Sequence, residues 1–152
     1  FLGEQMQHYV FIISYKSKRS NSPLGTEIFD SFIKKNIWVI HERTHYWKLM
    51  QPKDKVLFYL AGKQVFLGAA TITSNAQTFI LPDDMQWFKK KNPYKLLLSN
   101  IKIFQPPISR QVLSTAIDWK PLQGACIKIS LKDFDYILQQ DKDSVSPKIK
   151  TK

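Results

Sequence analysis

The amino-acid sequence predicts an α+β fold, in which a small, strongly bent β-sheet or barrel is flanked by two or three helices. The chain has 152 residues, the length of one domain, and 43% of them are hydrophobic, so it can bury a sizeable core. Short apolar runs typical of strands are separated by only two or three stretches with helical spacing. Consecutive strands without regular crossover helices do not suit a doubly wound parallel sheet, and we therefore expect the bent sheet.

The first part of the chain predicts two strands on either side of a helix. Residues 9–13 form an aromatic and β-branched run that is typical of a buried strand. Residues 26–35 place apolar side chains at helical spacing, and Asn36 can end the helix. Residues 37–40 then form a second apolar run, which predicts the next strand.

The middle of the chain predicts a hairpin followed by a long strand. Residues 56–60 and 65–73 are two strand-like runs, and Ala61-Gly62 between them is a turn signal. Residues 94–104 read as one long strand. Because proline has no N–H to donate to a sheet, we expect Pro106-Pro107 to end this strand.

The C-terminal part predicts two helices and a tail. Residues 109–115 are expected to form a short helix, and Ser130 is the expected N-cap of a helix over residues 131–140. Residues 142–152 are rich in Lys, Ser and Pro, which predicts a flexible basic tail or linker. The sequence thus predicts one domain over residues 1–141, followed by this tail.

The charge of the chain predicts an anionic partner. The formal net charge is +11, with 23 Lys and Arg against 12 Asp and Glu, and aromatic residues make up 13%. Nucleic acid is the first candidate and an acidic membrane surface the second. No apolar run approaches the length of a bilayer span and no signal peptide is evident, so we expect a cytoplasmic protein without a membrane partner. The single cysteine, Cys126, lies among apolar neighbours and is expected to be a buried, unreactive thiol.

One segment matches a catalytic pattern. His41-Glu-Arg-Thr-His45 fits the H-E-x-x-H pattern of zinc metallopeptidases, in which two histidines share one face of a helix. Residues 37–40 just before it are strand-like, and no histidine or glutamate follows His45 to serve as a third ligand. We therefore interpret the match as a basic loop and predict no enzyme, no metal and no cofactor. A small zinc hydrolase using His41, Glu42 and His45 is kept as an alternative.

Two segments interleave aromatic and basic residues. Residues 38–48 contain Trp38 together with further aromatic and basic side chains, and residues 87–91 begin with Trp87 and end in three lysines, with Tyr94 just beyond. Nucleic-acid sites use cations to bind phosphates and flat rings to stack on exposed bases. The alternative is that the rings belong to the core and the lysines to a solvated face. For Trp38 and Trp87 both interpretations stay open.

Several segments, taken in order, resemble the EVE domain. They are residues 37–39 (Ile-Trp-Val), 48–55 (Lys-Leu-Met-Gln-Pro-Lys-Asp-Lys), 56–60 and 66–71 (Phe-Leu-Gly-Ala-Ala-Thr), and the likeness extends over about residues 8–140. The related YTH domains are similar around Ile13-Ser14-Tyr15 and Ile37-Trp38. The resemblance implies a PUA-like fold, which is a bent β-barrel with helices around it. It also implies a pocket in which a modified base, flipped out of its strand, packs among aromatic rings.

The resemblance implies roles for individual residues. By this resemblance Trp38 would form the first wall of the aromatic pocket, and Trp87 or Phe88 would supply the other wall. The backbone of Val39 would face the polar edge of the base. Ser14 and Tyr15 fall where YTH domains place base-contacting groups, although Tyr15 replaces a small polar residue. The expected phosphate-binding residues flank this pocket in the sequence: Lys16, Lys18, Arg19, Arg43, Lys48, Lys89, Lys90 and Lys91.

The resemblance therefore implies a non-catalytic reader of a methylated base, with DNA as the favoured partner. EVE-like domains often serve as specificity modules of modification-dependent restriction systems, so a nuclease or motor would lie in further domains or subunits. The alternative within the same superfamily is a YTH-like reader of methylated RNA. Neither a G-x-x-x-x-G-K-[ST] nor a G-x-G-x-x-G phosphate loop is present in the chain.

Overall fold

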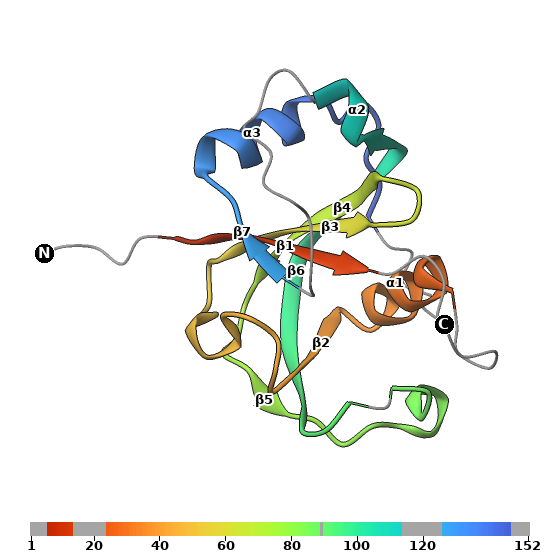
Figure 1. The fold of residues 1–152 in the computed structure, drawn as a ribbon, viewed down its shortest axis with the longest axis vertical. Helices are drawn as coiled ribbons and strands as arrows, with labels where there is room; N and C mark the ends of the chain where they lie inside the picture. The colour runs from red at the N-terminus through yellow and green to blue at the C-terminus, as the bar shows by residue number, and fades with distance from the viewer. Residues whose placement is uncertain (1–5, 14–23, 89, 114–125, 147–152) are drawn as a thin grey trace, which may run out of the picture.

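A strongly curled, mixed β-sheet forms the framework of the protein (Figure 1). The computed structural model describes residues 6–13, 24–88, 90–113 and 126–146. Within these ranges the elements are, in order, β1 (His8–Ile13), α1 (Gly25–Lys34), β2 (Ile37–His41), the 3-10 helix η1 (Trp47–Leu49), β3 (Lys55–Leu60), β4 (Val65–Ile72), β5 (Gln77–Thr78), the 3-10 helix η2 (Asp83–Met85), β6 (Pro93–Ser109), α2 (Arg110–Leu113), β7 (Cys126–Lys128) and α3 (Leu131–Gln139).

The strands pair in the order β2-β6-β4-β3-β1-β7, and the short β5 pairs with β6. β1 and β3 are parallel, whereas the other pairs are antiparallel. The 17-residue strand β6 pairs with β2 along its first part and with β4 along the rest, so it joins the two halves of the curl. In Figure 1 α2 and α3 lie at one end of the sheet and α1 lies beside β2. The predicted α+β fold with a bent sheet and two or three helices is confirmed.

The central strands are buried on both faces, which explains why their sequences are nearly continuous apolar runs. Successive side chains of β1 point to opposite sides, so Phe11 joins one cluster while Val10 joins another. The Phe11 cluster fills the curl of the sheet and includes Phe29, Phe32 and Ile33 of α1. The Val10 cluster is closed by α3. The helix and strands expected for residues 9–72 are confirmed, with bounds that differ by one or two residues.

Strand β6 does not end at the two prolines, and that prediction was wrong. The strand continues to Ser109, beyond Pro106-Pro107. The physical reason is the register of its pairing with β4, where Phe66 faces Ile108 but Gly68 faces Ile103. The prolines therefore lie in an irregular stretch in which the ladder is interrupted, and the missing N–H groups remove no ladder hydrogen bond.

Gly68 in β4 lies very close to the neighbouring strand β6. A Cβ atom added there would clash with the backbone carbonyl oxygen of Lys102 on the neighbouring strand β6. Backbone cannot move aside as a flexible side chain would, so only glycine allows β4 and β6 to approach this closely. Residues 66–71 are one of the segments that resemble the EVE domain, and the packing of β4 against β6 explains why this segment contains a glycine.

The C-terminal part closes the second cluster. Ser130 caps α3, because its side-chain oxygen accepts a hydrogen bond of 3.1 Å from the amide of Asp133, as predicted. Cys126 is fully buried, as predicted, and this burial raises the pKa of its thiol to about 12. Val145, inside the expected tail, exchanges backbone hydrogen bonds of 2.9 and 2.7 Å with Ile103. The domain boundary at residue 141 stays a prediction. Among the described helices, none is both long and apolar enough to cross a bilayer.

Candidate nucleic-acid interface

Trp38 of β2 lies at the centre of an aromatic cluster. Its ring centroid lies 4.7 Å from that of Phe58 and 4.9 Å from that of Phe32, and it stacks on Phe11 at 5.6 Å with an interplanar angle of 5°. Only 6% of Trp38 is exposed. The sequence left open whether the Trp38 ring belongs to the core or to a binding surface. The structure shows a ring that packs with the core on several sides.

Trp87 lies on the same cluster from a distant part of the chain. Its ring stacks on Phe32 at 5.8 Å and 24°, and its indole N–H donates a hydrogen bond of 3.1 Å to the carbonyl oxygen of Asp84. Phe88 follows, with its ring 6.1 Å from that of Trp87 and 6.4 Å from that of His41. Trp87 and Phe88 are both half-buried. The fold thus brings the two predicted walls, Trp38 and Trp87, onto one shared ring, that of Phe32.

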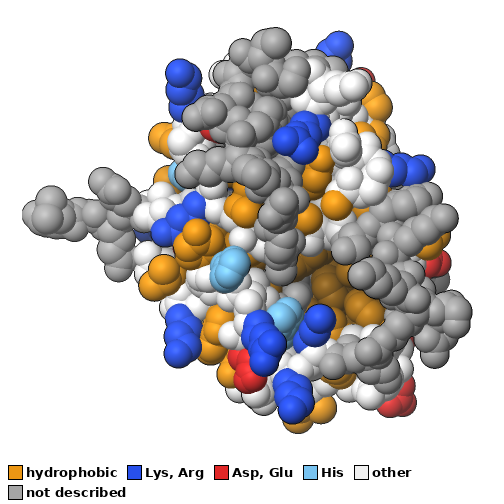
Figure 2. Space-filling view, viewed as in Figure 1, with side chains coloured by type: hydrophobic (Ala, Val, Ile, Leu, Met, Phe, Trp, Pro, Cys, Tyr) orange, Lys and Arg blue, Asp and Glu red, His pale blue; other side chains and the backbone are white. Residues whose placement is uncertain are grey.

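The surface over β2 and beside α1 is hollowed (Figure 1 and Figure 2). Figure 2 shows a recess with hydrophobic side chains at its floor, over β2 and beside α1, with histidine, lysine and arginine side chains next to it. Its position coincides with the elements that carry Trp38 and Phe32. A concave apolar surface next to cations is the shape that an extruded base requires.

The backbone of Val39 has groups that are not used by the sheet ladder. Asn36 and Leu98 lie opposite each other, and Leu98 donates a hydrogen bond of 2.9 Å to the carbonyl of Asn36. They therefore form one of the hydrogen-bonded pairs of the ladder, which alternate with pairs that are not hydrogen-bonded. Because such pairs alternate along an antiparallel ladder, the N–H and C=O of Val39, opposite Lys95, point away from β6. In the described part of the chain β2 is an end strand of the sheet, so these groups face its outer edge.

Pairing of β2 with β6 joins the two basic and aromatic segments. His41 at the end of β2 faces Pro93 at the start of β6. Across this junction Asn92 donates hydrogen bonds of 2.7 and 3.1 Å to the carboxylate of Glu42. The exposed basic residues on the two connected turns are Arg43, Lys90 and Lys91. Lys48 belongs to the same surface, with its Nζ 5.6 Å from the centre of the Trp47 ring.

The H-E-x-x-H segment is a turn and not a helix. His41 ends β2, and its amide donates a hydrogen bond of 3.1 Å to the hydroxyl of Thr44. Nδ1 of His41 accepts a hydrogen bond of 3.2 Å from the amide of Arg43. Burial and then the positive charge of Lys90 lower the pKa of His41, which favours the neutral imidazole that accepts this bond. Within the described ranges, no three or more His, Cys, Asp or Glu side chains gather as a metal site.

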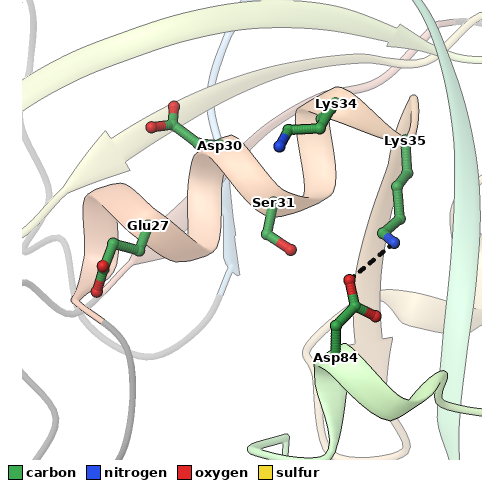
Figure 3. A pocket seen from close by; sticks show the side chains of 6 residues that line it. All are labelled: Glu27, Asp30, Ser31, Lys34, Lys35 and Asp84. Carbon is green, nitrogen blue, oxygen red and sulfur yellow. Dashed lines mark hydrogen bonds and ion pairs between the residues drawn. The ribbon is translucent and has the colours of Figure 1, made fainter.

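A second cavity lies between α1 and η2 and has a different character. Its volume is about 260 Å³, and its lining contains only polar and charged residues: Glu27, Asp30, Ser31, Lys34, Lys35 and Asp84. Figure 3 shows Lys35 reaching from the end of α1 to Asp84, with 3.1 Å between Nζ and Oδ2. Without an aromatic wall this cavity does not suit a base. Its ion pair instead ties the η2 segment, and with it Trp87, to α1.

Six of the predicted site residues lie outside the described residues: Ser14, Tyr15, Lys16, Lys18, Arg19 and Lys89. The remaining predicted residues come from β2, the turn that follows it, η1 and the segment before β6, and the fold places these parts together. Sequence reasoning missed Phe32, which its helical spacing marks only as a core residue. It also missed the pairing of Trp47 with Tyr94, because no local pattern links residues 47 positions apart.

No protein-family model matches the chain, and no curated protein matches it in sequence. Solved structures do match in shape. The N-terminal domain of Staphylothermus marinus McrB has a TM-score of 0.60 at 10% identity, covering 88% of this chain and 93% of that domain. The complex of the YTH domain-containing protein mmi1 with RNA has a TM-score of 0.58 at 10% identity, covering 89% and 82%. Human THYN1, in complex with DNA containing 5-methylcytosine, has a TM-score of 0.57 at 11% identity, covering 90% and 98%.

The chain has the PUA-like fold. Because the identities are only 10–11%, these matches establish the fold alone, and it is the fold that the resemblance in the sequence implies. Within the PUA-like fold of this chain, the hollow over β2 and the neighbouring cations form the candidate interface.

Proposed function

We propose that this chain is a non-catalytic nucleic-acid-binding module, which holds a methylated base, flipped out of DNA, in the hollow over β2. The observation that carries this proposal is the convergence of Trp38 and Trp87 on Phe32, beside a recess with an apolar floor. The half-buried Trp87 supplies the accessible ring, whereas the packed Trp38 holds the floor rigid. The outward-facing backbone of Val39 offers a donor and an acceptor for the polar edge of the base.

The energetics fit a reader of moderate selectivity. Stacking a base on an aromatic ring contributes ~1–3 kcal/mol. Burying one methyl group adds ~0.8 kcal/mol, which corresponds to a several-fold higher affinity for the methylated base. A well-packed pocket raises this ratio of affinities to some tens. Extrusion of the base costs a few kcal/mol. The basic residues Arg43, Lys48, Lys90 and Lys91 offset that cost by binding phosphates. By the family resemblance, Ser14, Tyr15, Lys16, Lys18, Arg19 and Lys89 complete the pocket and its basic rim.

Modified DNA is the proposed partner, and methylated RNA is the second candidate. The structure of THYN1 with DNA containing 5-methylcytosine supports the first, and the structure of mmi1 with RNA supports the second. The McrB match shows that this fold occurs as one domain of a longer protein, which supports the proposed link to a nuclease or motor elsewhere.

The decisive experiment compares four matched probes: a DNA duplex with one central 5-methylcytosine, the same duplex unmethylated, and two RNA strands that differ by one methylated base. Fluorescence anisotropy at several salt concentrations gives the affinities. We expect the native protein to favour methylated DNA by several-fold to some tens. Equal affinity for methylated and unmethylated probes of both kinds refutes the base pocket, and a preference confined to RNA selects the second candidate.

Two variants separate the pocket from the basic rim. Trp87→Ala should abolish the methyl preference but keep salt-sensitive background binding, because it removes the ring and leaves the cations. Replacement of Lys90 and Lys91 by Gln should weaken binding to every probe alike and reduce the slope of log affinity against log salt by about 1 for each phosphate contact. An unchanged slope would remove these lysines from the interface.

A further inference from the structure

A second aromatic surface lies next to the proposed pocket. The rings of Trp47 in η1 and Tyr94 in β6 stack at a centroid distance of 4.4 Å with an interplanar angle of 16°. Both residues are half-buried, so part of each side chain packs against the core and part stays accessible. Two stacked rings from separate segments form a flat, rigid platform of the size of a base.

The platform lies on the same face of the β2–β6 ladder as Trp38. Tyr94 faces Ile40 in the β2–β6 ladder, and Trp38 faces Leu96 two positions away. Because side chains alternate along a strand, Trp38, Ile40 and Tyr94 lie on the same face of the sheet. The platform is therefore displaced from Trp38 by about 7 Å along β2, at ~3.4 Å per residue. A nucleotide next to a base held in the hollow would reach it.

Lysine side chains lie near the rings of Trp47 and of its neighbour Tyr46. Lys48 Nζ lies 5.6 Å from the centre of the Trp47 ring. Next to it, Tyr46 is 39% exposed, and Lys128 Nζ lies 4.9 Å from the centre of its ring.

We propose that the Trp47–Tyr94 platform, with Lys48, is a second base-binding surface, which takes an unpaired nucleotide beside the flipped base. Rings combined with cations match a base joined to a phosphate. The nucleotide must be unpaired, because stacking neighbours cover both faces of a base inside a duplex. The inference rests on the proposed nucleic-acid function, but it concerns a different part of the ligand and does not depend on which base modification is recognised.

The test uses Trp47→Leu and Trp47→Phe, because both shorten the side chain but only Phe keeps a ring. The probes are a short single-stranded DNA with one central 5-methylcytosine, and two copies in which the nucleotide on one side or the other of that base is abasic. We expect Trp47→Leu to weaken binding of the intact strand by roughly 5- to 100-fold, the range that the loss of one base stack predicts, and Trp47→Phe to retain most of the affinity. Leu49→Ala is the matched control, since Leu49 is exposed in the same η1 turn but has no ring.

The abasic probes locate the effect. In the native protein one of them should bind as weakly as the intact strand binds to Trp47→Leu, and this probe should lose no further affinity in that variant. Equal binding of Trp47→Leu and Trp47→Phe to the intact strand overturns the proposal. So does an abasic penalty of the same size in Trp47→Leu and in the native protein. Thermal unfolding of each variant verifies that it is folded.

The result is separable from the test of the pocket. The pocket is judged by the ratio of affinities for methylated and unmethylated duplexes and by Trp87→Ala. The platform is judged by the difference between the Phe and Leu variants at position 47. If the native protein has no methyl preference but Trp47→Phe binds clearly more tightly than Trp47→Leu, the methylated-base pocket is refuted and the platform is supported. If the native protein prefers the methylated probe but the two variants bind equally, only the platform is refuted.

Discussion

Replacement of Trp38 by alanine distinguishes a core residue from a free pocket wall. Trp38 is 94% buried and its ring contacts those of Phe11, Phe32 and Phe58. A tryptophan buries about 150–250 Å² of surface, and truncation of a buried aromatic residue to alanine costs about 3–5 kcal/mol through lost burial and the cavity left behind. We therefore expect Trp38→Ala to lower the free energy of unfolding by about this amount, a large fraction of the 5–15 kcal/mol that is typical of a domain.

Urea unfolding followed by circular dichroism measures this change. Trp38→Phe is the milder comparison, because it keeps a ring against Phe32 and should cost about half as much. Trp87→Ala is the matched control at the surface, with an expected cost of about 1 kcal/mol for a half-buried ring. If Trp38→Ala costs less than about 1 kcal/mol, the ring does not belong to the core and the reasoning from its contacts is refuted. A loss of nucleic-acid binding in Trp38→Ala therefore has meaning only beside its stability, and Trp87→Ala is the better probe of the pocket.

Two further predictions concern the scaffold. Gly68→Ala should destabilise the protein by at least ~2 kcal/mol in the same urea experiment, because its Cβ would clash with the carbonyl of Lys102, whereas Ala70→Gly in the same strand should cost only about 1 kcal/mol. A well-tolerated Gly68→Ala would contradict the close approach of β4 to β6. His8 packs on Phe134, and burial lowers the pKa of His8 below the ordinary 6.5, although the negative charges of Asp135 and Asp54 act to raise it. Below pH 6.5 the unfolded chain therefore binds more protons at this position than the folded protein does. The stability of the folded protein consequently falls as the pH drops. Thermal unfolding between pH 7 and pH 5 should show a smaller loss of stability for His8→Phe than for the native protein, and equal losses would exclude His8 as the cause.

Local patterns were enough to predict the elements. Apolar periodicity predicts β1, α1, β2 and the β3–β4 hairpin, because each pattern is short-ranged and set by which faces are buried. Pro106-Pro107 misled the prediction for β6, since whether a missing N–H matters depends on the register of a partner strand. That register is a property of two segments far apart in the chain, and no local rule contains it.

The candidate site was predictable in part. The interleaved rings and cations of residues 38–48 and 87–91 indicate nucleic-acid binding from the sequence, and the family resemblance adds the flipped, modified base. Nothing in either segment indicates that β2 and β6 pair and place the two segments together. The sequence likewise marks Trp38 and Trp87 as equivalent candidates, whereas packing makes one a core residue and leaves the other half-exposed.

The sequence alone determined a basic, aromatic-rich chain with enough apolar residues for one α+β domain, because charge, composition and periodicity are summed residue by residue. Only the tertiary structure decided that Phe32 of α1 contacts both tryptophans and that Trp47 stacks on Tyr94. These contacts join residues that are tens of positions apart, and they exist only where the curl of the sheet brings their strands together. The charge indicates a phosphate-bearing partner, but the arrangement of the rings depends on the pairing of β2 with β6.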